Sequence, residues 1–306
     1  MKKKIDKQPE ESVLLRKKSR KKNVQFKKTS RLRNFVQPRK ESLVLNKDSL
    51  TLSVLHSPKN DNTASLFGDD WQQTVARGVL TFGIELSSKQ LDLLTFHAGE
   101  LIKWNSRFNI TAIVEPFEMA LKHFIDSIAI APFIPDGSKV IDLGTGGGFP
   151  GMPLKVINPT LEVVMADSSR KKVSFLNNLI MQSNLLVQSN LSQSTISCQN
   201  DLNGIKAIHC RAEELGKDPE YAHQFDFVIS RAFAALDRFT DMALPFLKSS
   251  GAILAMKGDL SPDELTPVVI REDITAEISE YVLPFEQHKR CIVKIRLSEF
   301  YQDHIV

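Results

Sequence analysis

The sequence has few cysteines and no long uninterrupted apolar run. Its 306 residues include only Cys198, Cys210 and Cys291, an odd number without the C-x-x-C spacing of zinc ligands. Neither a disulfide framework nor a metal site is therefore expected. No segment reaches the roughly 20 consecutive apolar residues of a membrane-spanning helix, and the lysine-rich start lacks the apolar core of a secretory signal. We expect a soluble, cytoplasmic protein without membrane association.

Charge is distributed unevenly along the chain. Residues 1–40 hold sixteen Lys or Arg side chains against three acidic ones, a net charge of +13, whereas the remainder carries −9. Basic residues with few large apolar side chains between them cannot form a core, so residues 1–65 are predicted to be a disordered basic extension. An arm of this kind favours additional contact with a nucleic-acid backbone, because it releases counterions. The alternatives are a solubilising extension, a nuclear-localisation signal or an organelle transit peptide.

A glycine-rich turn between two apolar segments carries most of the chemical information. Residues 140–167 read VIDLGTGGGFPGMPLKVINPTLEVVMAD. Gly144, Gly146 and Gly148 remove Cβ atoms where a strand must turn into a helix, so a ligand can reach unpaired backbone N–H groups. Asp167 ends the next strand about 20 residues later, where an acid accepts hydrogen bonds from ribose hydroxyls. This arrangement predicts a nucleoside site.

The spacing of the glycines fits two kinds of nucleoside. Gly146, Gly148 and Gly151 satisfy the G-x-G-x-x-G pattern of dinucleotide sites. Asp142 stands two residues before the first glycine, and the register Asp-Leu-Gly-Thr-Gly-Gly-Gly resembles the turn of S-adenosylmethionine-dependent methyltransferases. An NAD(P)-binding oxidoreductase therefore stays open beside a methyltransferase, as does a glycine turn that binds no ligand.

Apolar periodicity predicts an α/β protein. Helices are expected first, and strands alternating with helices imply parallel pairing through right-handed crossovers. Two last strands joined by a few residues require an antiparallel hairpin. We therefore predict a doubly wound, mainly parallel seven-stranded sheet with a C-terminal hairpin, preceded by N-terminal helices. Helices are expected at 71–81, 91–104, 117–133, 150–156, 170–186 and 236–247, of which the third is broken by Pro132 and Pro135. Strands are expected at 139–144, 162–167, 205–210, 225–230, 251–258, 274–283 and 290–297, and an exposed loop at 188–204.

Motifs spread over residues 71–297 resemble one family. The sequence is similar to the ribosomal small subunit methyltransferase G family, also called glucose-inhibited division protein B. The resemblance implies a helical part at 66–135 and an S-adenosylmethionine-dependent methyltransferase domain at 136–306. It also implies methyl transfer from S-adenosylmethionine to N7 of guanine 527 in 16S ribosomal RNA, free or in the small subunit. A non-catalytic RNA-binding assembly factor remains the alternative. The matching motifs are WNSRFNITAI (104–113), EMALKHFIDSI (118–128), DLGTGGGFPGMPLKV (142–156), MADSSRKKVSFL (165–176), RAEEL (211–215), FDFVISRAFAAL (225–236) and MKG (256–258).

The resemblance also implies which residues bind the cofactor. Gly144 and Phe149 are expected against it, Asp167 and Ser168 near its ribose, and two residues of RAEEL at its adenine. The complete expected set is Asp142, Gly144, Gly146, Gly148, Phe149, Asp167, Ser168, Ala212, Glu213 and Arg231. Gly147 stands where many members of the family have proline or alanine.

The reaction that the resemblance implies needs positioning more than acid–base chemistry. Guanine N7 already has an in-plane lone pair, so no proton has to leave and no general base is expected; proximity and orientation supply the catalysis. Arg231 faces the methionine end or an RNA phosphate, or it forms an ion pair with Asp142 or Asp226. His123 positions the base, or it caps and packs. Lys257 meets a phosphate, or it is a solvated strand end.

Polar and basic residues near these motifs are expected to contact RNA. Asn105, Asn109 and His123 are candidates for lining the pocket of the target base, which has to be unstacked to enter it. A local basic face is compatible with an acidic body, because net charge does not fix the surface distribution. The expected face comprises Trp104, Asn105, Arg107, Lys122, Arg170, Lys171, Lys172 and Arg231.

Overall fold

The computed structural model describes residues 66–189, 202–231, 235–286 and 288–299. The predicted extension 1–65, with its basic arm 1–40, lies outside the described residues. So does most of the predicted loop 188–204, together with Cys198.

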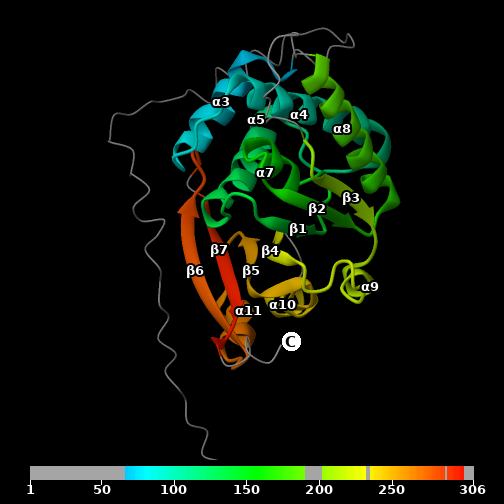
Figure 1. Cartoon of the computed structure of the whole chain (residues 1–306). Helices are drawn as coiled ribbons and strands as arrows, with labels where there is room; N and C mark the ends of the chain where they lie inside the picture. Colours follow the sequence, from blue (N-terminus) through cyan, green and yellow to red (C-terminus); the bar gives the residue numbers. More distant parts are fainter. Residues whose placement is uncertain (1–65, 190–201, 232–234, 287, 300–306) are drawn as a thin grey trace, which may run out of the picture.

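Seven strands form one sheet in the order β3-β2-β1-β4-β5-β7-β6 (Figure 1). Neighbouring strands from β3 to β5 pair in parallel, and β7 pairs antiparallel with both β5 and β6. The predicted doubly wound sheet with an antiparallel C-terminal hairpin is thereby confirmed. The strands are β1 (Lys139–Leu143), β2 (Glu162–Asp167), β3 (Ile205–His209), β4 (Phe225–Arg231), β5 (Leu247–Lys257), β6 (Ile274–Val282) and β7 (Lys289–Leu297).

The helices before the sheet follow the apolar periodicity of the sequence. Helix α3 spans Asp69–Leu80 and α4 spans Ser88–Phe108. The N-cap of α4 is Ser87, whose hydroxyl accepts from the Gln90 backbone N at 3.3 Å while Gln90 Oε1 accepts from the Ser87 backbone N at 2.9 Å. This reciprocal capping box satisfies N–H groups that the first helical turn leaves unpaired.

The single helix predicted over 117–133 is instead a series of short segments. They are α5 (Pro116–Met119), a π-helical turn η2 (Ala120–Ile125), α6 (Asp126–Ile128) and the 3₁₀ turn η3 (Ala131–Phe133). The break at Pro132 was expected, because the proline ring removes a backbone donor. The π-helical turn before it was not expected, and there the carbonyls of Lys122 and His123 accept from the Arg231 guanidinium.

Helices cover both faces of the sheet and produce two apolar cores (Figure 1). One face carries the N-terminal helices with α7 (Gly151–Ile157) and α8 (Arg170–Ser189). The other carries α9 (Ala212–Leu215), α10 (Leu236–Ala243) and α11 (Pro262–Val269). Periodicity missed α9 and α11, which are only 4 and 8 residues long. Helix α10 ends before the predicted 247, because the 3₁₀ turn η4 (Leu244–Phe246) contains a proline.

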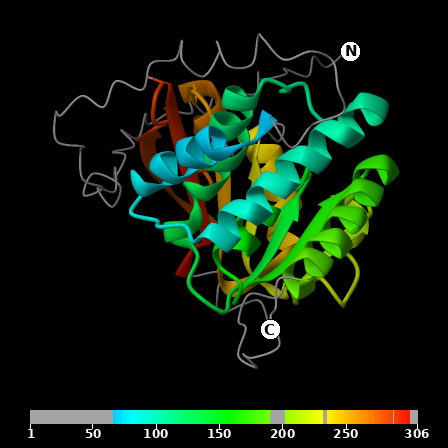
Figure 2. The same ribbon diagram turned by 90° about the horizontal axis from the view of Figure 1, so that it is seen from above.

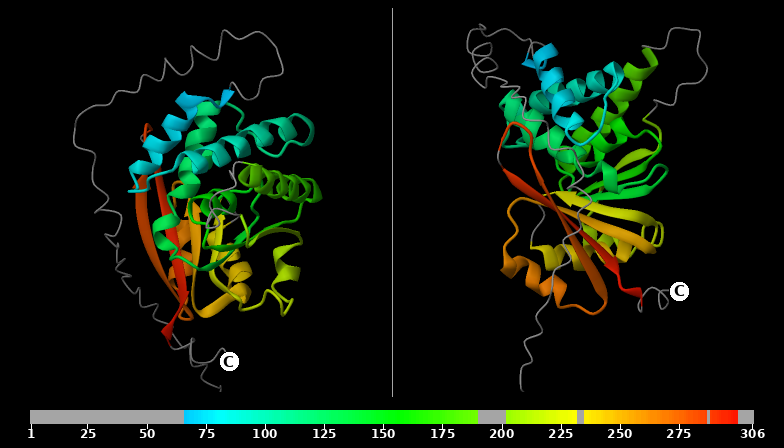
Figure 3. Two further views of the ribbon diagram at one scale, coloured as in Figure 1. Left: turned by 45° about the horizontal axis from the view of Figure 1, so that its top comes forward. Right: turned by 90° about the vertical axis from the view of Figure 1, so that its left-hand side faces the viewer.

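The C-terminal hairpin packs against the N-terminal helices (Figure 3). The rings of Phe82, just after α3, and Tyr281, in β6, meet edge to face with centroids 5.9 Å apart. The same apolar core holds Trp71 in α3 and Ile292 in β7. One core therefore joins the predicted helical part to the sheet.

Parallel pairing brings the ends of β1 to β5 to one edge of the sheet. The carboxyl ends are Leu143, Asp167, His209, Arg231 and Lys257. In open α/β sheets ligands bind in the crevice outside this edge. The topology therefore directs the search for a site to the residues that follow these strands.

Membrane-spanning helices, metal-ligand clusters and disulfides are absent from the described residues. No helix in these ranges is both long enough and apolar enough to cross a membrane. No group of three or more metal-ligating side chains comes together there. Cys210 and Cys291 are both free thiols.

Candidate active site

The glycine turn after β1 adopts backbone angles that favour glycine. Gly144, Gly146 and Gly148 have φ angles of 71°, 60° and 90°, a region that L side chains rarely enter. The backbone N of Gly144 donates to the carbonyl of Ala166 in β2 at 2.8 Å. The turn is thereby held against the end of β2.

Asp167 lies at the end of β2 and fixes the turn from its other side. Its Oδ2 accepts from the backbone N of Gly146 at 2.9 Å, and its Oδ1 accepts from the backbone N of Ser169 at 2.8 Å. The ammonium group of Lys172 lies 3.9 Å from the same carboxylate. A carboxylate oxygen has two lone pairs, so each oxygen can still accept a hydrogen bond from a ligand.

A cavity of about 220 Å³ opens beside this carboxylate. It contains five residues of the expected cofactor set, contributed by the ends of β1 and β2 and by the segment after β3. These are Gly144, Asp167, Ser168, Ala212 and Glu213. Sequence reasoning missed the other lining residues, which are Leu143, Ala166, Cys210, Arg211 and Met242. Three of the five directly adjoin predicted site residues, and Cys210 lies two positions before Ala212. Met242 comes from α10, and no local signal marks it.

Asp142 lies behind the turn and does not line the cavity. Its side chain is fully buried, and its Oδ2 accepts from the Thr145 hydroxyl at 2.6 Å and from the backbone N of Gly151 at 2.9 Å. Its Oδ1 is buried without a hydrogen-bond partner in the described part of the chain. Burial raises the pKa of Asp142 to about 7, because low polarity disfavours the charged form.

Phe149 leaves the turn in the opposite direction, toward the N-terminal helices. It is 4% exposed. The imidazole rings of His97 and His123 stack on it, with centroid distances of 4.7 and 4.5 Å. The guanidinium carbon of Arg231 lies 5.2 Å from the Phe149 ring centroid. The structure therefore places Phe149 in a packed aromatic cluster outside the lining of the cavity.

His97 joins this cluster to the glycine turn, and sequence reasoning missed it. Its Nε2 donates to the carbonyl of Gly147 at 2.7 Å. Burial lowers the pKa of His97 to about 4, so the imidazole is neutral near pH 7. The histidine comes from the middle of α4, where a buried helix position gives no sequence signal for such a contact.

His123 is a buried, fully bonded imidazole. Its Nδ1 accepts from Arg231 Nη2 at 2.8 Å, because a guanidinium only donates. Its Nε2 therefore carries the proton and donates to the Thr111 hydroxyl at 2.8 Å. Burial, followed by the charge of Arg231, lowers the pKa of His123 to about 3. His123 was expected either to position the target base or to cap and pack. In the structure it packs on Phe149 and is hydrogen-bonded to Arg231 and Thr111.

Arg231, at the end of β4, is engaged by the π-helical segment and by Asp126. The guanidinium donates to the backbone carbonyl of Lys122 and lies 3.7 Å from the Asp126 carboxylate. The expected ion pair with Asp142 or Asp226 was wrong. Asp142 acts on it only at longer range. Asp226 stands at the start of β4, on the opposite edge of the sheet, and binds Lys248 at 2.8 Å.

Asp126 ties this cluster to the C-terminal hairpin. Its Oδ1 accepts from the Tyr281 hydroxyl at 2.7 Å and lies 3.7 Å from Nε of Arg290. Burial raises the pKa of Tyr281 well above its ordinary value, so the phenol keeps its proton. Side chains from α6, β4, β6 and β7 thus meet around one buried carboxylate.

The remaining sequence candidates lie apart from the cavity. Lys257 is not a solvated strand end: its side chain is 11% exposed and its ammonium binds Glu264 at 2.6 Å. Asn105 Oδ1 accepts from the backbone N of Thr111 at 2.9 Å. Asn109 is exposed and ends α4 in a left-handed conformation with a φ angle of 49°.

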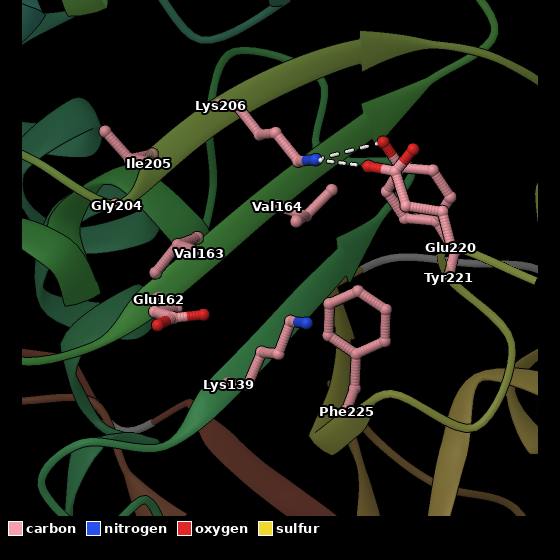
Figure 4. A pocket seen from close by; sticks show the side chains of 10 residues that line it. All are labelled: Lys139, Glu162, Val163, Val164, Gly204, Ile205, Lys206, Glu220, Tyr221 and Phe225. Atoms are coloured by element: carbon pink, nitrogen blue, oxygen red, sulfur yellow. Dashed lines mark hydrogen bonds and ion pairs between the residues drawn. The ribbon is translucent and has the colours of Figure 1, made fainter.

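A second cavity, of about 270 Å³, lies where β1 to β4 begin. Figure 4 shows its two lysines. Lys206 donates to the Tyr221 hydroxyl at 3.0 Å and pairs with Glu220 at 3.1 Å, and the ammonium of Lys139 lies 5.5 Å from the Phe225 ring centroid. None of the predicted site residues lines this cavity, so we assign the candidate site to the first.

Comparisons with known proteins find sequence relatives over most of the chain. A family model described as rRNA small subunit methyltransferase G matches residues 90–293. A protein of Acetivibrio thermocellus with the name ribosomal RNA small subunit methyltransferase G is 36% identical over 229 residues, 74% of this chain and 88% of that protein. A protein of Geobacter metallireducens with the same name is 38% identical over 223 residues, 72% of this chain and 93% of that protein. A solved S-adenosylmethionine-dependent methyltransferase of Aquifex aeolicus is 14% identical, with a TM-score of 0.41 over 58% of this chain and 92% of that one.

Proposed function

The chain belongs to the rRNA small subunit methyltransferase G family, and on that premise we propose that it methylates N7 of guanine 527 in 16S ribosomal RNA. The observation that carries this proposal is the family match over residues 90–293, which contains the glycine turn, the cavity and the cluster around Arg231. The cofactor is S-adenosylmethionine. An NAD(P)-dependent oxidoreductase and a non-catalytic assembly factor are not favoured, because the match covers strands β1 to β6 and all the residues that line the cavity.

The cavity has the chemistry that S-adenosylmethionine requires. Asp167 presents an ionisable carboxylate at the carboxyl edge of the sheet, where such an acid binds ribose hydroxyls. Ser168 and Glu213 add polar groups, and Leu143 and Ala212 add apolar surface for an adenine ring. The residues present therefore fit this cofactor, and we assign Asp167 and Ser168 to its ribose and Ala212 and Glu213 to its adenine.

The reaction needs no base, and the two histidines beside the turn are too weakly basic to serve as one. S-adenosylmethionine supplies an electrophilic methyl group on a positively charged sulfur. Guanine N7 would accept this methyl group through its in-plane lone pair, with the C–S bonding electrons left on sulfur, so no proton would have to leave. His97 and His123 are neutral because their pKa values are lowered to about 4 and about 3. Catalysis therefore rests on orientation and proximity.

We assign Arg231 and His123 to positioning. Their polar groups are committed to each other, to Asp126 and to backbone carbonyls, and Phe149 transmits this packing to the glycine turn. Lys257 holds α11 to the end of β5 through Glu264. On this proposal none of the three accepts a proton during methyl transfer.

Because the proposed substrate is ribosomal RNA, we propose that the enzyme acts in the cytoplasm and that the small ribosomal subunit is its partner. We include the basic arm 1–40 in this proposal as an additional RNA contact, because its net charge of +13 suits a phosphate backbone. Removing residues 1–65 is expected to weaken RNA binding most at low salt, where the charge of the arm is least screened. Titrating RNA binding at several salt concentrations measures this effect.

The deciding experiment is transfer of labelled methyl from S-adenosylmethionine to small-subunit particles and to deproteinised 16S RNA. We expect 7-methylguanosine at position 527, identified by mass spectrometry of nuclease fragments. Methylation at another nucleotide would refute the target, and cofactor binding without transfer to either RNA would refute the substrate. Absence of cofactor binding by folded protein would favour the assembly factor.

A further inference from the structure

The end of α4 and the start of α8 lie side by side and run in opposite directions (Figure 2). Their contacts form a ladder of aromatic rings from the core to the surface. Phe175 is fully buried, and the half-buried Trp104 meets its ring edge to face at 5.8 Å. Phe108 lies 5.5 Å from Trp104 and is 38% exposed. A large apolar ring is thus presented to solvent and supported from behind.

One cation lies over the exposed ring, and two more adjoin the ring or this cation in sequence. The ammonium of Lys171 lies 5.8 Å from the Phe108 ring centroid. Arg107 and Arg170 are exposed neighbours in sequence of these two residues. Within the described ranges, Arg107, Arg170 and Lys171 form no ion pair, whereas Lys103, one turn earlier, is neutralised by Glu100 at 3.0 Å. The surface therefore combines an aromatic face with uncompensated cations.

This surface of Phe108 and the neighbouring cations is connected along the chain to the cofactor cavity on one side and to the Arg231 cluster on the other. Helix α8 begins at Arg170, two residues after Ser168 in the cavity lining. After Phe108 the chain turns at Asn109 and reaches Thr111, which is hydrogen-bonded to His123. A ligand that spans the turn between these two regions would pass close to the exposed ring.

We propose that Phe108 is a stacking platform for an unpaired base of the RNA substrate, with Lys171, Arg107 and Arg170 binding the adjacent phosphates. The proposal rests on the proposed rRNA methylation and names the surface that would hold the strand beside the target guanine. An exposed aromatic ring flanked by cations is how proteins bind single-stranded RNA, because every base has a π-face and every nucleotide a charge. The charge complementarity favours RNA over a protein partner at this surface.

The test compares Phe108→Ala with Phe108→Trp in the full-length protein. Loss of the ring is expected to raise KM for 16S RNA and for small-subunit particles roughly tenfold, as loss of one base–aromatic stack does. Phe108→Trp keeps an aromatic face for stacking, so its KM for both substrates should stay within about twofold of the wild-type value. Affinity for S-adenosylmethionine and the melting temperature should not change in either variant. Ile270→Ala is the matched control, because this side chain is 66% exposed and lies beyond α11, on the other face.

The cations are tested separately by their salt dependence. Lys171→Gln should reduce the slope of log affinity for single-stranded RNA against log salt by about 0.7. An unchanged slope would remove Lys171 from the phosphate contacts.

Several outcomes would refute base stacking on Phe108 and leave the proposed function intact. An unchanged KM in Phe108→Ala, with active wild type, refutes stacking. A KM raised for assembled particles alone identifies a ribosomal protein as the contact instead of RNA. A lowered melting temperature together with weakened cofactor binding, unrescued by Phe108→Trp, shows a structural role. Failure of wild type on both substrates would instead refute the proposed function itself.

Discussion

The two sides of the glycine turn use polar side chains in different ways, although both lie at the carboxyl edge of the same sheet. On the β2–β3 side, Asp167 and Glu213 line an open cavity and keep capacity to bind a ligand. On the β4 side, His123 and Asp126 are buried and Arg231 is partly buried, and the three side chains satisfy one another. On our proposal one side receives the cofactor and the other holds the turn in place.

This difference shows that a polar residue in a family motif need not line the cavity. Arg231 and Asp167 both end strands of the parallel sheet, yet only Asp167 meets the cavity. The N-terminal helices cause the difference, because the π-helical segment covers the end of β4 and leaves the end of β2 open. Substitutions on the β4 side should therefore affect mainly stability, and those on the β2–β3 side mainly ligand binding.

The largest effect is expected from Arg231→Ala. Removing the guanidinium leaves the buried carboxylate of Asp126 without this partner and His123 Nδ1 without a donor, and breaking a buried ion pair costs about 3–5 kcal/mol. Urea unfolding should show this loss, and methyl transfer should fall with the folded fraction. Arg231→Lys keeps the charge but not the planar fork, so it should recover only part of the stability. A free energy of unfolding unchanged by Arg231→Ala would mean that the cluster is not structural.

Asp167→Asn should separate binding from folding on the open side. Hydrogen bonds to a charged acceptor are worth about 1.5–3 kcal/mol, so the Kd for S-adenosylmethionine should rise roughly tenfold to a hundredfold. The free energy of unfolding should change by only about 1 kcal/mol, since the amide oxygen still accepts one backbone N–H. Isothermal titration calorimetry and urea unfolding measure the two quantities. Glu272→Gln, at an exposed acid outside the cavity, is the control and should bind the cofactor as wild type does.

The turn between the two sides offers a matched pair of alanine substitutions. Gly148 has a φ angle of 90°, and an added Cβ would lie 3.0 Å from a methyl group of Leu176. Gly148→Ala should therefore cost about 1–3 kcal/mol of stability and weaken cofactor binding. Gly147 lacks the positive φ angle, and its added Cβ would approach Leu101 and Phe149 side chains at 3.1 and 3.2 Å. Gly147→Ala should cost less than about 1 kcal/mol, and equal losses in the two variants would show that backbone strain is not the cause.

The open side was largely predictable from sequence because its residues follow one another along the chain. Gly144, Asp167 and Ala212 each lie within a few residues of the end of a strand, and strand ends of a parallel sheet meet at one edge. Hydrophobic alternation and the short final connection were also sufficient for the antiparallel hairpin of β6 and β7. Local patterns therefore determine both the sheet and the cavity.

The closed side was not predictable, because its partners are far apart in sequence. Arg231 and Asp126 are 105 positions apart, and Asp126 and Tyr281 are 155 apart. The π-helical turn that brings His123 to Arg231 has no signal in apolar periodicity, which predicted one regular helix there. Tertiary packing alone selects Asp126 over Asp142 and Asp226 as the partner of Arg231.

The smallest expected effect is a pH dependence that originates behind the turn. Burial raises the pKa of Asp142 to about 7 in the ligand-free protein. A cationic cofactor favours the ionised carboxylate, so binding is coupled to loss of a proton, and affinity should increase as the pH rises through about 7. Because Asp142 does not line the cavity, we expect a change of only several-fold between about pH 6 and about pH 8. Asp142→Asn should abolish this dependence in calorimetric titrations, whereas kcat at saturating substrates should stay flat, since His97 and His123 have pKa values of about 4 and about 3. The same pH dependence of affinity in Asp142→Asn would assign the titration to another group.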